Sequence, residues 1–150
     1  MKKINVWVGS DHGGFDLKSE VIEMLSGDPR YSICDVGADG GESVDYPQYA
    51  VAVSEGVLSE EGGFGILICG TGVGMSIVAN KQRGIRAVLA HNELVGAMGR
   101  RHNDANVLCL GARVIGSALG LEIVKSFLSA EFEGGRHERR VKQFESDFEN

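Results

Sequence analysis

The sequence predicts an α/β fold in which a parallel sheet is covered by helices. Short apolar runs alternate with helical patterns along the whole chain of 150 residues. The apolar runs are hydrophobic on both faces, as strands buried between two layers of helices are. No linker, repeat or low-complexity segment interrupts this alternation, so we expect residues 1–150 to form a single domain.

Five strands and five helices follow from this pattern. The strands are predicted over residues 4–8, 32–36, 64–69, 85–90 and 106–110. The helices are predicted over residues 15–25, 48–60, 74–80, 93–101 and 118–129. In the first helix, Leu17, Val21, Met24 and Leu25 have the spacing of one buried face.

The C-terminal segment, residues 131–150, differs from the rest of the chain. From Arg136 onward it is strongly charged, with apolar residues only at Val141, Phe144 and Phe148. That spacing predicts a last helix that packs on another surface, and we expect this surface to belong to a neighbouring subunit.

Composition excludes several classes of partner. The net charge of −6 provides no basic field for nucleic acid. No stretch approaches the ~20 apolar residues that span a bilayer, and the first apolar run is too short for a secretory signal. Cys34, Cys69 and Cys109 are odd in number and have apolar neighbours, which favours reduced thiols in the cytoplasm. The sequence holds neither Cys-x-x-Cys nor His-Glu-x-x-His, so nothing in it argues for zinc.

The run from Ile66 to Gly74 carries the strongest indication of function. Its strand ends at Cys69, and glycines follow at positions 70, 72 and 74 before a helical segment. A strand, a glycine-rich turn and a helix N-terminus direct several backbone N–H groups at one point, which suits an anion. A thiol beside such a site is a candidate base, because positive potential favours the thiolate. The alternatives are a tight turn and a small buried side chain.

This loop differs from the common nucleotide-binding loops. A dinucleotide fingerprint requires a third glycine at the position of Met75, and a Walker loop requires Gly-Lys-Ser/Thr. What remains is a compact site for one oxyanion or phosphate.

Other strand and helix ends carry further candidate groups, each with a structural alternative. Asp11 and His12 follow the first strand, where Asp11 could instead cap the first helix. His102 closes the fourth helix, where the dipole favours a histidine in any case. Arg136 and Arg140 share a helical face that matches a phosphate, although a solvated charged tail is the alternative.

The remaining histidines and cysteines are given structural interpretations. His91 and His137 are interpreted as surface histidines, and Cys34 and Cys109 as residues inside strands. Together, the candidate groups suit proton abstraction next to a carbonyl of a phosphorylated small molecule.

Six segments resemble the type B ribose-5-phosphate isomerases, a family that also holds allose-6-phosphate and galactose-6-phosphate isomerases. They are GSDHGGF at 9–15, DYP at 45–47, ICGTGVG at 68–74, ANK at 79–81, HNDANVL at 102–108 and EGGRH at 133–137. The resemblance implies a Rossmann-like three-layer αβα sandwich with a five-stranded parallel sheet. It also implies a homodimer or homotetramer whose active site lies between two subunits.

The resemblance implies a role for each candidate residue. Cys69 moves a proton between sugar C2 and C1, and His102 assists ring opening with Asn103 beside it. The enediolate is held by Thr71 and the backbone of Gly70, Gly72, Val73 and Gly74. The sugar pocket is lined by Asp11, His12 and Tyr46. The phosphate is bound by Arg113, Arg136 and Arg140. No metal or organic cofactor is implied.

One branch of the family has a glutamate later in the glycine loop in place of the cysteine. Met75 occupies that position here and Cys69 is present, so the chain resembles the thiolate branch.

The expected activity is the interconversion of D-ribose 5-phosphate and D-ribulose 5-phosphate, a step of the pentose phosphate pathway. Two alternatives within the family are an isomerase of a six-carbon sugar phosphate and a subunit of a heteromeric galactose-6-phosphate isomerase. A third, from another class, is a non-catalytic module that binds a phosphorylated ligand.

Overall fold

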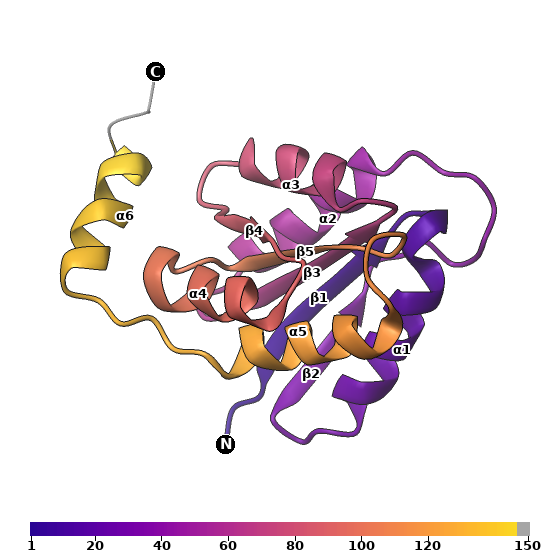
Figure 1. Ribbon diagram of the computed structural model, residues 1–150, viewed down its shortest axis with the longest axis horizontal. Coiled ribbons are helices and arrows are strands. Elements are labelled where there is room, and N and C mark those ends of the chain that lie inside the picture. Colours follow the sequence, from indigo (N-terminus) through magenta and orange to yellow (C-terminus); the bar gives the residue numbers. More distant parts are fainter. Residues whose placement is uncertain (147–150) are drawn as a thin grey trace.

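The five predicted strands form one parallel sheet in the order β2-β1-β3-β5-β4 (Figure 1). The computed structural model describes residues 1–146. The strands are β1 (Ile4–Ser10), β2 (Tyr31–Asp35), β3 (Phe64–Cys69), β4 (Ala87–Leu89) and β5 (Val107–Gly111). The helices are α1 (Phe15–Ser26), α2 (Pro47–Leu58), α3 (Val73–Asn80), α4 (Glu93–Asn103), α5 (Ser117–Ser129) and α6 (Arg136–Ser146), with a short 3₁₀ turn η1 (His12–Gly14) before α1.

Helices cover both faces of the sheet, so the predicted αβα sandwich is confirmed (Figure 1). Side chains of the central strands alternate between two apolar clusters, because successive strand residues point to opposite faces. Ile66 and Ile68 of β3 join the cluster under α1 and α5, whereas Leu67 and Cys69 join the cluster under α2 and α3. The two-sided burial explains why β3 reads as a continuous apolar run.

The order of the strands along the chain reverses between β1 and β3. After β1 the chain forms β2, which pairs with one side of β1. The chain then crosses back and forms β3, which pairs with the other side of β1. Loops that follow β1 and β3 therefore diverge at the carboxyl ends of these strands, where open α/β sheets bind ligands.

The element boundaries agree with the predictions to within a few residues, with one informative difference. The predicted strand over 85–90 is reduced to the three residues of β4, which pairs only with β5 at the edge of the sheet. Just before it, the Arg86 amide donates to the Asn106 side chain at 2.8 Å, so this part of the backbone leaves the strand ladder.

Cys34 and Asp11 differ from their sequence interpretations. Cys34 was expected in apolar surroundings, but β2 is an edge strand and leaves this side chain exposed. Asp11 caps η1 and not α1, because its carboxylate accepts from the amides of Gly13 and Gly14.

Helix α6 packs on α4 of the same chain (Figure 1). Val141 is buried, whereas Phe144 is 40% exposed. Phe148 lies outside the described residues. The docking of residues 131–150 on a neighbouring subunit therefore stays a prediction.

The described helices include none whose length and apolar character would let it cross a membrane.

An ion pair between the buried Lys18 and the exposed Asp35 joins α1 to the end of β2. The Lys18 side chain is 2% exposed, and its ammonium donates to Asp35 Oδ1 at 2.6 Å. The same oxygen accepts from the Gly37 amide at 2.9 Å, and the Gly37 carbonyl accepts from the Ser10 amide at 2.8 Å. The pair therefore fixes the loop after β2 against the carboxyl end of β1.

We expect Asp35→Ala to destabilise the protein by about 1–3 kcal/mol, because it leaves the Lys18 ammonium buried without its partner. Thermal unfolding followed by circular dichroism measures this loss. Glu42→Ala, which removes an exposed carboxylate, is the control. The double variant Lys18→Met/Asp35→Ala should recover part of the loss, since no buried charge then remains. Equal melting of Asp35→Ala and Glu42→Ala would contradict this role of the pair.

Candidate active site

Cys69 lies at the carboxyl end of β3, with its sulfur against the glycine loop. The side chain is 5% exposed, and its Sγ accepts a hydrogen bond from the Gly72 amide at 3.1 Å. Thr71 and Val73, in the same loop, are exposed. The sulfur therefore lies at the boundary between the core and an open loop, and a backbone amide is directed at it.

The conformation of Gly72 makes this contact possible. Gly72 has φ +78°, and a Cβ there would lie 2.5 Å from Leu89 Cδ1 and 3.0 Å from the Leu110 carbonyl oxygen. Gly72 is also the N-cap of α3 and has no side chain to accept from the first-turn amides. The Val73 amide donates to Thr71 Oγ1 at 3.3 Å, and the other first-turn amides are suited to an external anion.

The loop after β1 lies beside the glycine loop. The Asp11 amide donates to the Ile68 carbonyl at 3.3 Å, which joins the ends of β1 and β3. His12 Nδ1 accepts from the Val44 amide at 3.2 Å, so a neutral His12 carries its hydrogen on Nε2. Val44 belongs to the loop after β2, residues 36–46, and Tyr46 at the end of that loop lies against Gly74. A Cβ on Gly74 would lie 2.5 Å from Tyr46 Cζ.

Arg113 completes this group from the loop after β5. Its amide donates to the Gly70 carbonyl at 2.9 Å, and its guanidinium Nε lies 3.5 Å from where a Gly70 Cβ would be. A positive charge beside the loop favours an anionic ligand. The structure thus brings Asp11, His12, Tyr46, Cys69, the loop 70–74 and Arg113 to one edge of the sheet.

The other predicted residues lie at the opposite edge. Helix α4 returns antiparallel to the strands, so His102 and Asn103 at its end precede the start of β5. There the Asn106 carbonyl accepts from the Gly65 amide of β3 at 2.9 Å. Cys69 is four residues further along β3, which corresponds to about 13 Å. Arg136 and Arg140 of α6 belong to the same distant group as His102, since α6 packs on α4.

His102 belongs to a cluster that includes two residues to which the sequence analysis assigned no site role. Its ring stacks on that of His137 at 4.1 Å with an interplanar angle of 7°. Glu133 Oε1 lies 3.5 Å from His102 Nε2 and 3.9 Å from His137 Nε2. The interpretation of His137 as a surface histidine is wrong, because only 8% of it is exposed. Helical spacing could not have signalled the contact of Glu133 with His137, because Glu133 precedes α6 and Gly134 and Gly135 between them have positive φ.

This cluster has the ligand types of a metal site but not the orientation. Two imidazoles and a carboxylate suit zinc, and their ligand atoms lie within 4.8 Å of one another. Each imidazole lone pair lies in its ring plane, and the two planes are nearly parallel, so the lone pairs do not converge on one point. Glu133 Oε2 also accepts from Arg101 Nε at 3.0 Å. We therefore interpret the cluster as a set of polar contacts.

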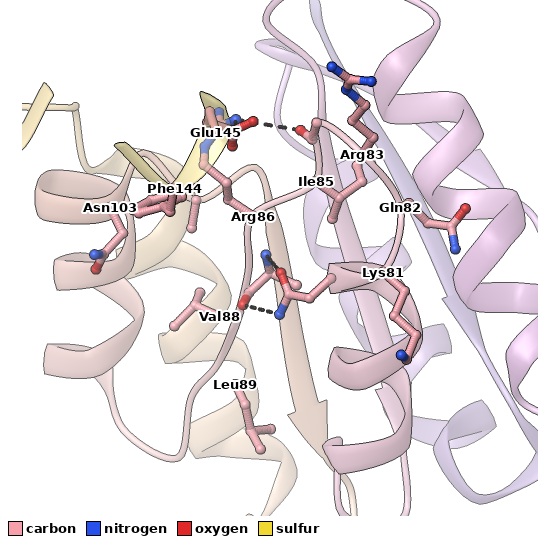
Figure 2. Close-up of a pocket in the computed structure, with 14 residues that line it drawn as sticks. Lys81, Gln82, Arg83, Ile85, Arg86, Val88, Leu89, Asn103, Phe144 and Glu145 are labelled. Atoms are coloured by element: carbon pink, nitrogen blue, oxygen red, sulfur yellow. Dashed lines mark hydrogen bonds and ion pairs between the residues drawn. The ribbon is translucent and has the colours of Figure 1, made fainter. Parts of the chain in front are cut away.

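A groove of about 870 Å³ lies at the same edge as His102 (Figure 2). Its walls are residues 80–89 together with Asn103, Ala105, Phe144 and Glu145. Within it, Arg86 Nη1 contacts Glu145 Oε1 at 3.0 Å, which ties α6 to the turn before β4. The groove does not include Cys69 or its loop, so it is separate from the cysteine site.

Cys109 is a structural cysteine, as predicted. It is completely buried in β5, and burial, with a further contribution from the charge of Cys69, raises the pKa of its thiol. Cys109 therefore remains protonated. Cys69 differs in position, because its sulfur accepts from the Gly72 amide and Arg113 lies against the neighbouring Gly70.

The fold and this site define a Rossmann-like α/β protein whose sheet edge suits a small anionic ligand. A family model described as Ribose/Galactose Isomerase matches residues 6–144, and the chain belongs to this family. Among curated proteins, the ribose-5-phosphate isomerase B of Escherichia coli K12 is 47% identical over 142 residues, which cover 95% of this chain and 93% of that one.

Two solved structures show the same fold. Ribose-5-phosphate isomerase B of Clostridium thermocellum has a TM-score of 0.93 at 49% identity, covering 96% of this chain and 97% of that one. Ribose-5-phosphate isomerase B of Mycoplasma genitalium, solved with bound ribulose 5-phosphate, has a TM-score of 0.94 at 38% identity and covers 100% of both chains.

We expect the protein to lose stability as the pH falls, because His137 accepts a proton less readily in the folded chain than in the unfolded chain. Burial lowers the pKa of His137, as do His102, Arg136 and Arg140, while the Glu133 carboxylate opposes them. The unfolded chain, with a histidine pKa near ~6.5, then binds the proton more readily than the folded chain does. Stability is lost as pH falls from about 7.5 toward the lower folded pKa.

Melting temperatures measured between pH 7.5 and 5 test this expectation. The loss should be smaller in His137→Gln than in the wild type. The exposed histidine in His91→Gln is the control and should leave the loss unchanged. An identical pH dependence in wild type and His137→Gln would exclude this histidine as a source.

Proposed function

We propose that the chain is an aldose–ketose isomerase that interconverts D-ribose 5-phosphate and D-ribulose 5-phosphate through a cis-enediolate. Membership of the ribose/galactose isomerase family supports the reaction class. The names of the Escherichia coli and Mycoplasma genitalium relatives, the latter with ribulose 5-phosphate bound, support the five-carbon substrate. In metabolism this reaction belongs to the pentose phosphate pathway.

The observation that carries the proposal is the hydrogen bond from the Gly72 amide to Cys69 Sγ. The proposal assigns this amide, together with the positive charge of Arg113 beside Gly70, the role of supporting a thiolate during the reaction. In the proposed reaction, the Cys69 thiolate removes the proton from C2 of the open-chain aldose and returns it to C1. Thr71 and the amides of Gly70, Gly72, Val73 and Gly74 bind the enediolate oxygens, and one such donor is worth about 10²–10³ in kcat. These steps need no metal or organic cofactor.

The carboxyl edge of one chain supplies only part of the proposed site. Asp11, His12 and Tyr46 line the sugar pocket, and Arg113 contacts the phosphate. His102 and Asn103 end α4 at the other edge of the same chain, and α6, which carries Arg136 and Arg140, packs on α4. We therefore propose a homo-oligomer in which these four residues reach the Cys69 site of a neighbouring copy.

Apolar side chains at the carboxyl edge support such an interface. Val73 and Ile77 of α3 are 46% and 53% exposed, Leu94 of α4 is 66% exposed and Val114 after β5 is 53% exposed. Exposed apolar groups mark contact surfaces where they gather in one patch, and we propose that these do.

We place the protein in the cytoplasm. Its three cysteines are free thiols in the structure, and free thiols suit a reducing compartment.

Cys69→Ala should fold normally and lose isomerisation, because a general base contributes about 10²–10⁴ to the rate. The assay follows conversion of ribose 5-phosphate and, in parallel, allose 6-phosphate. Cys109→Ala is the control for loss of a buried thiol. We expect a higher kcat/KM for the five-carbon sugar. Near-normal turnover by Cys69→Ala would eliminate the thiolate base, and a preference for allose 6-phosphate would assign the six-carbon substrate instead.

Mixing two inactive variants tests the shared site. Cys69→Ala and His102→Asn each disable every site when present alone. In a mixed two-fold dimer, one of the two sites combines the intact Cys69 with the intact His102 of the other copy. Co-expression should therefore restore about a quarter of the wild-type activity, since half of the dimers are mixed and each holds one intact site. No recovery in co-purified mixed oligomers would show that both residues serve one chain's site.

A further inference from the structure

Glu133 contacts two side chains at the end of α4 and one on α6, and its backbone is fixed at α4 as well. Its amide donates to the Arg101 carbonyl at 3.0 Å. Its Oε2 accepts from Arg101 Nε at 3.0 Å, and its Oε1 lies 3.5 Å from His102 Nε2. The carboxylate is thus held from two directions beside one nitrogen of His102.

His137 holds the His102 ring from the side. The two rings stack at 4.1 Å with nearly parallel planes, and His137 is itself buried on α6. A ring stacked on a buried neighbour has less freedom to rotate. Glu133 and His137 together therefore define both the position of the imidazole and the direction of its nitrogens.

The carboxylate also determines which nitrogen of His102 carries the hydrogen. An acceptor beside Nε2 favours the tautomer with hydrogen on Nε2, so the lone pair is on Nδ1. Contacts of this kind are often long without substrate and shorten in the complex, which is consistent with the observed 3.5 Å. Nδ1, on the other side of the ring, is then the nitrogen that can accept a proton from a ligand.

We propose that Glu133 is a positioning residue for His102 in opening the sugar ring, with His137 as the stacked support. This rests on the proposed isomerase function. In the step, His102 Nδ1 takes the proton of the anomeric hydroxyl while the bond from C1 to the ring oxygen breaks and the C1 carbonyl forms. The same proton then passes to the former ring oxygen, which becomes the C4 hydroxyl, and the imidazole returns to its neutral form. The Glu133 carboxylate stabilises the imidazolium that exists between the two transfers.

An assay that separates ring opening from proton abstraction tests this role. Ribulose 5-phosphate has its C5 oxygen esterified and cannot close a five-membered ring through it. Exchange of its C1 hydrogen with D₂O, followed by NMR, therefore requires Cys69 and the glycine loop but no ring opening. Isomerisation of ribose 5-phosphate, measured on the same enzyme, requires both.

Glu133→Gln keeps the shape of the side chain and removes its charge. We expect kcat for ribose 5-phosphate to fall about 10–100-fold, the range for loss of an orienting partner. KM should change little, and C1 exchange in ribulose 5-phosphate should stay at the wild-type rate. Glu133→Asp, which retains the charge, should show a smaller loss. Glu131→Gln, an exposed glutamate two residues earlier, is the matched control and should behave as wild type.

Three outcomes would overturn the positioning role. Exchange and isomerisation that fall together would assign Glu133 to general integrity of the site. A raised KM with unchanged kcat would mean that Glu133 only holds α6 and its arginines in place. Activity equal to that of Glu131→Gln would mean that the carboxylate has no part in the reaction. Failure of the isomerase proposal itself is distinguishable, because the wild-type chain would then show neither exchange nor isomerisation.

Discussion

The hydrogen bond from the Gly72 amide to the Cys69 sulfur is the contact on which the candidate site depends. It requires a strand that ends at Cys69 and a left-handed residue three positions later, and only glycine fits there without a clash. The loop is held on both sides by backbone. Asp11 bonds to the end of β3 on one side, and on the other a Cβ at Gly111 would lie 2.5 Å from the Thr71 carbonyl oxygen. The rigid sheet thus sets the geometry of a loop that has almost no side chains of its own.

Parallel topology imposes a second constraint. All strands end at one edge of the sheet, so every connecting helix that starts at this edge must end at the other. Cys69 follows a strand and His102 ends a helix, so their separation in one chain is a consequence of the fold. The proposed reaction uses both residues, and this separation is the reason for proposing a site shared between two copies of the chain. Helix α6 follows the same constraint, because it packs on α4 and lies away from α1, on the far side of the molecule (Figure 1).

Sequence patterns were most reliable where local physics decides the structure. β3 was predicted at its observed bounds, 64–69, because an apolar run buried on both faces has a distinct pattern. The α3 helix was predicted within one residue, since the glycine loop marks where it begins. Patterns were less reliable at Cys34 and His137. Apolar neighbours in the sequence do not reveal that β2 is an edge strand, and a charged segment does not reveal that one of its histidines is buried by stacking on another helix.

By itself, the sequence determined the alternation of strands and helices, the glycine loop after β3 and the thiol at the edge of that loop. The spacing of apolar residues and the backbone conformations open to glycine are local properties, each decided within a few residues. Both are therefore visible in the sequence. Only the tertiary structure decided the strand order, the division of the candidate residues between two edges, and the contact of Glu133 and His137 with His102. These depend on which elements pack together, and that is decided by the summed burial of surfaces far apart in the sequence.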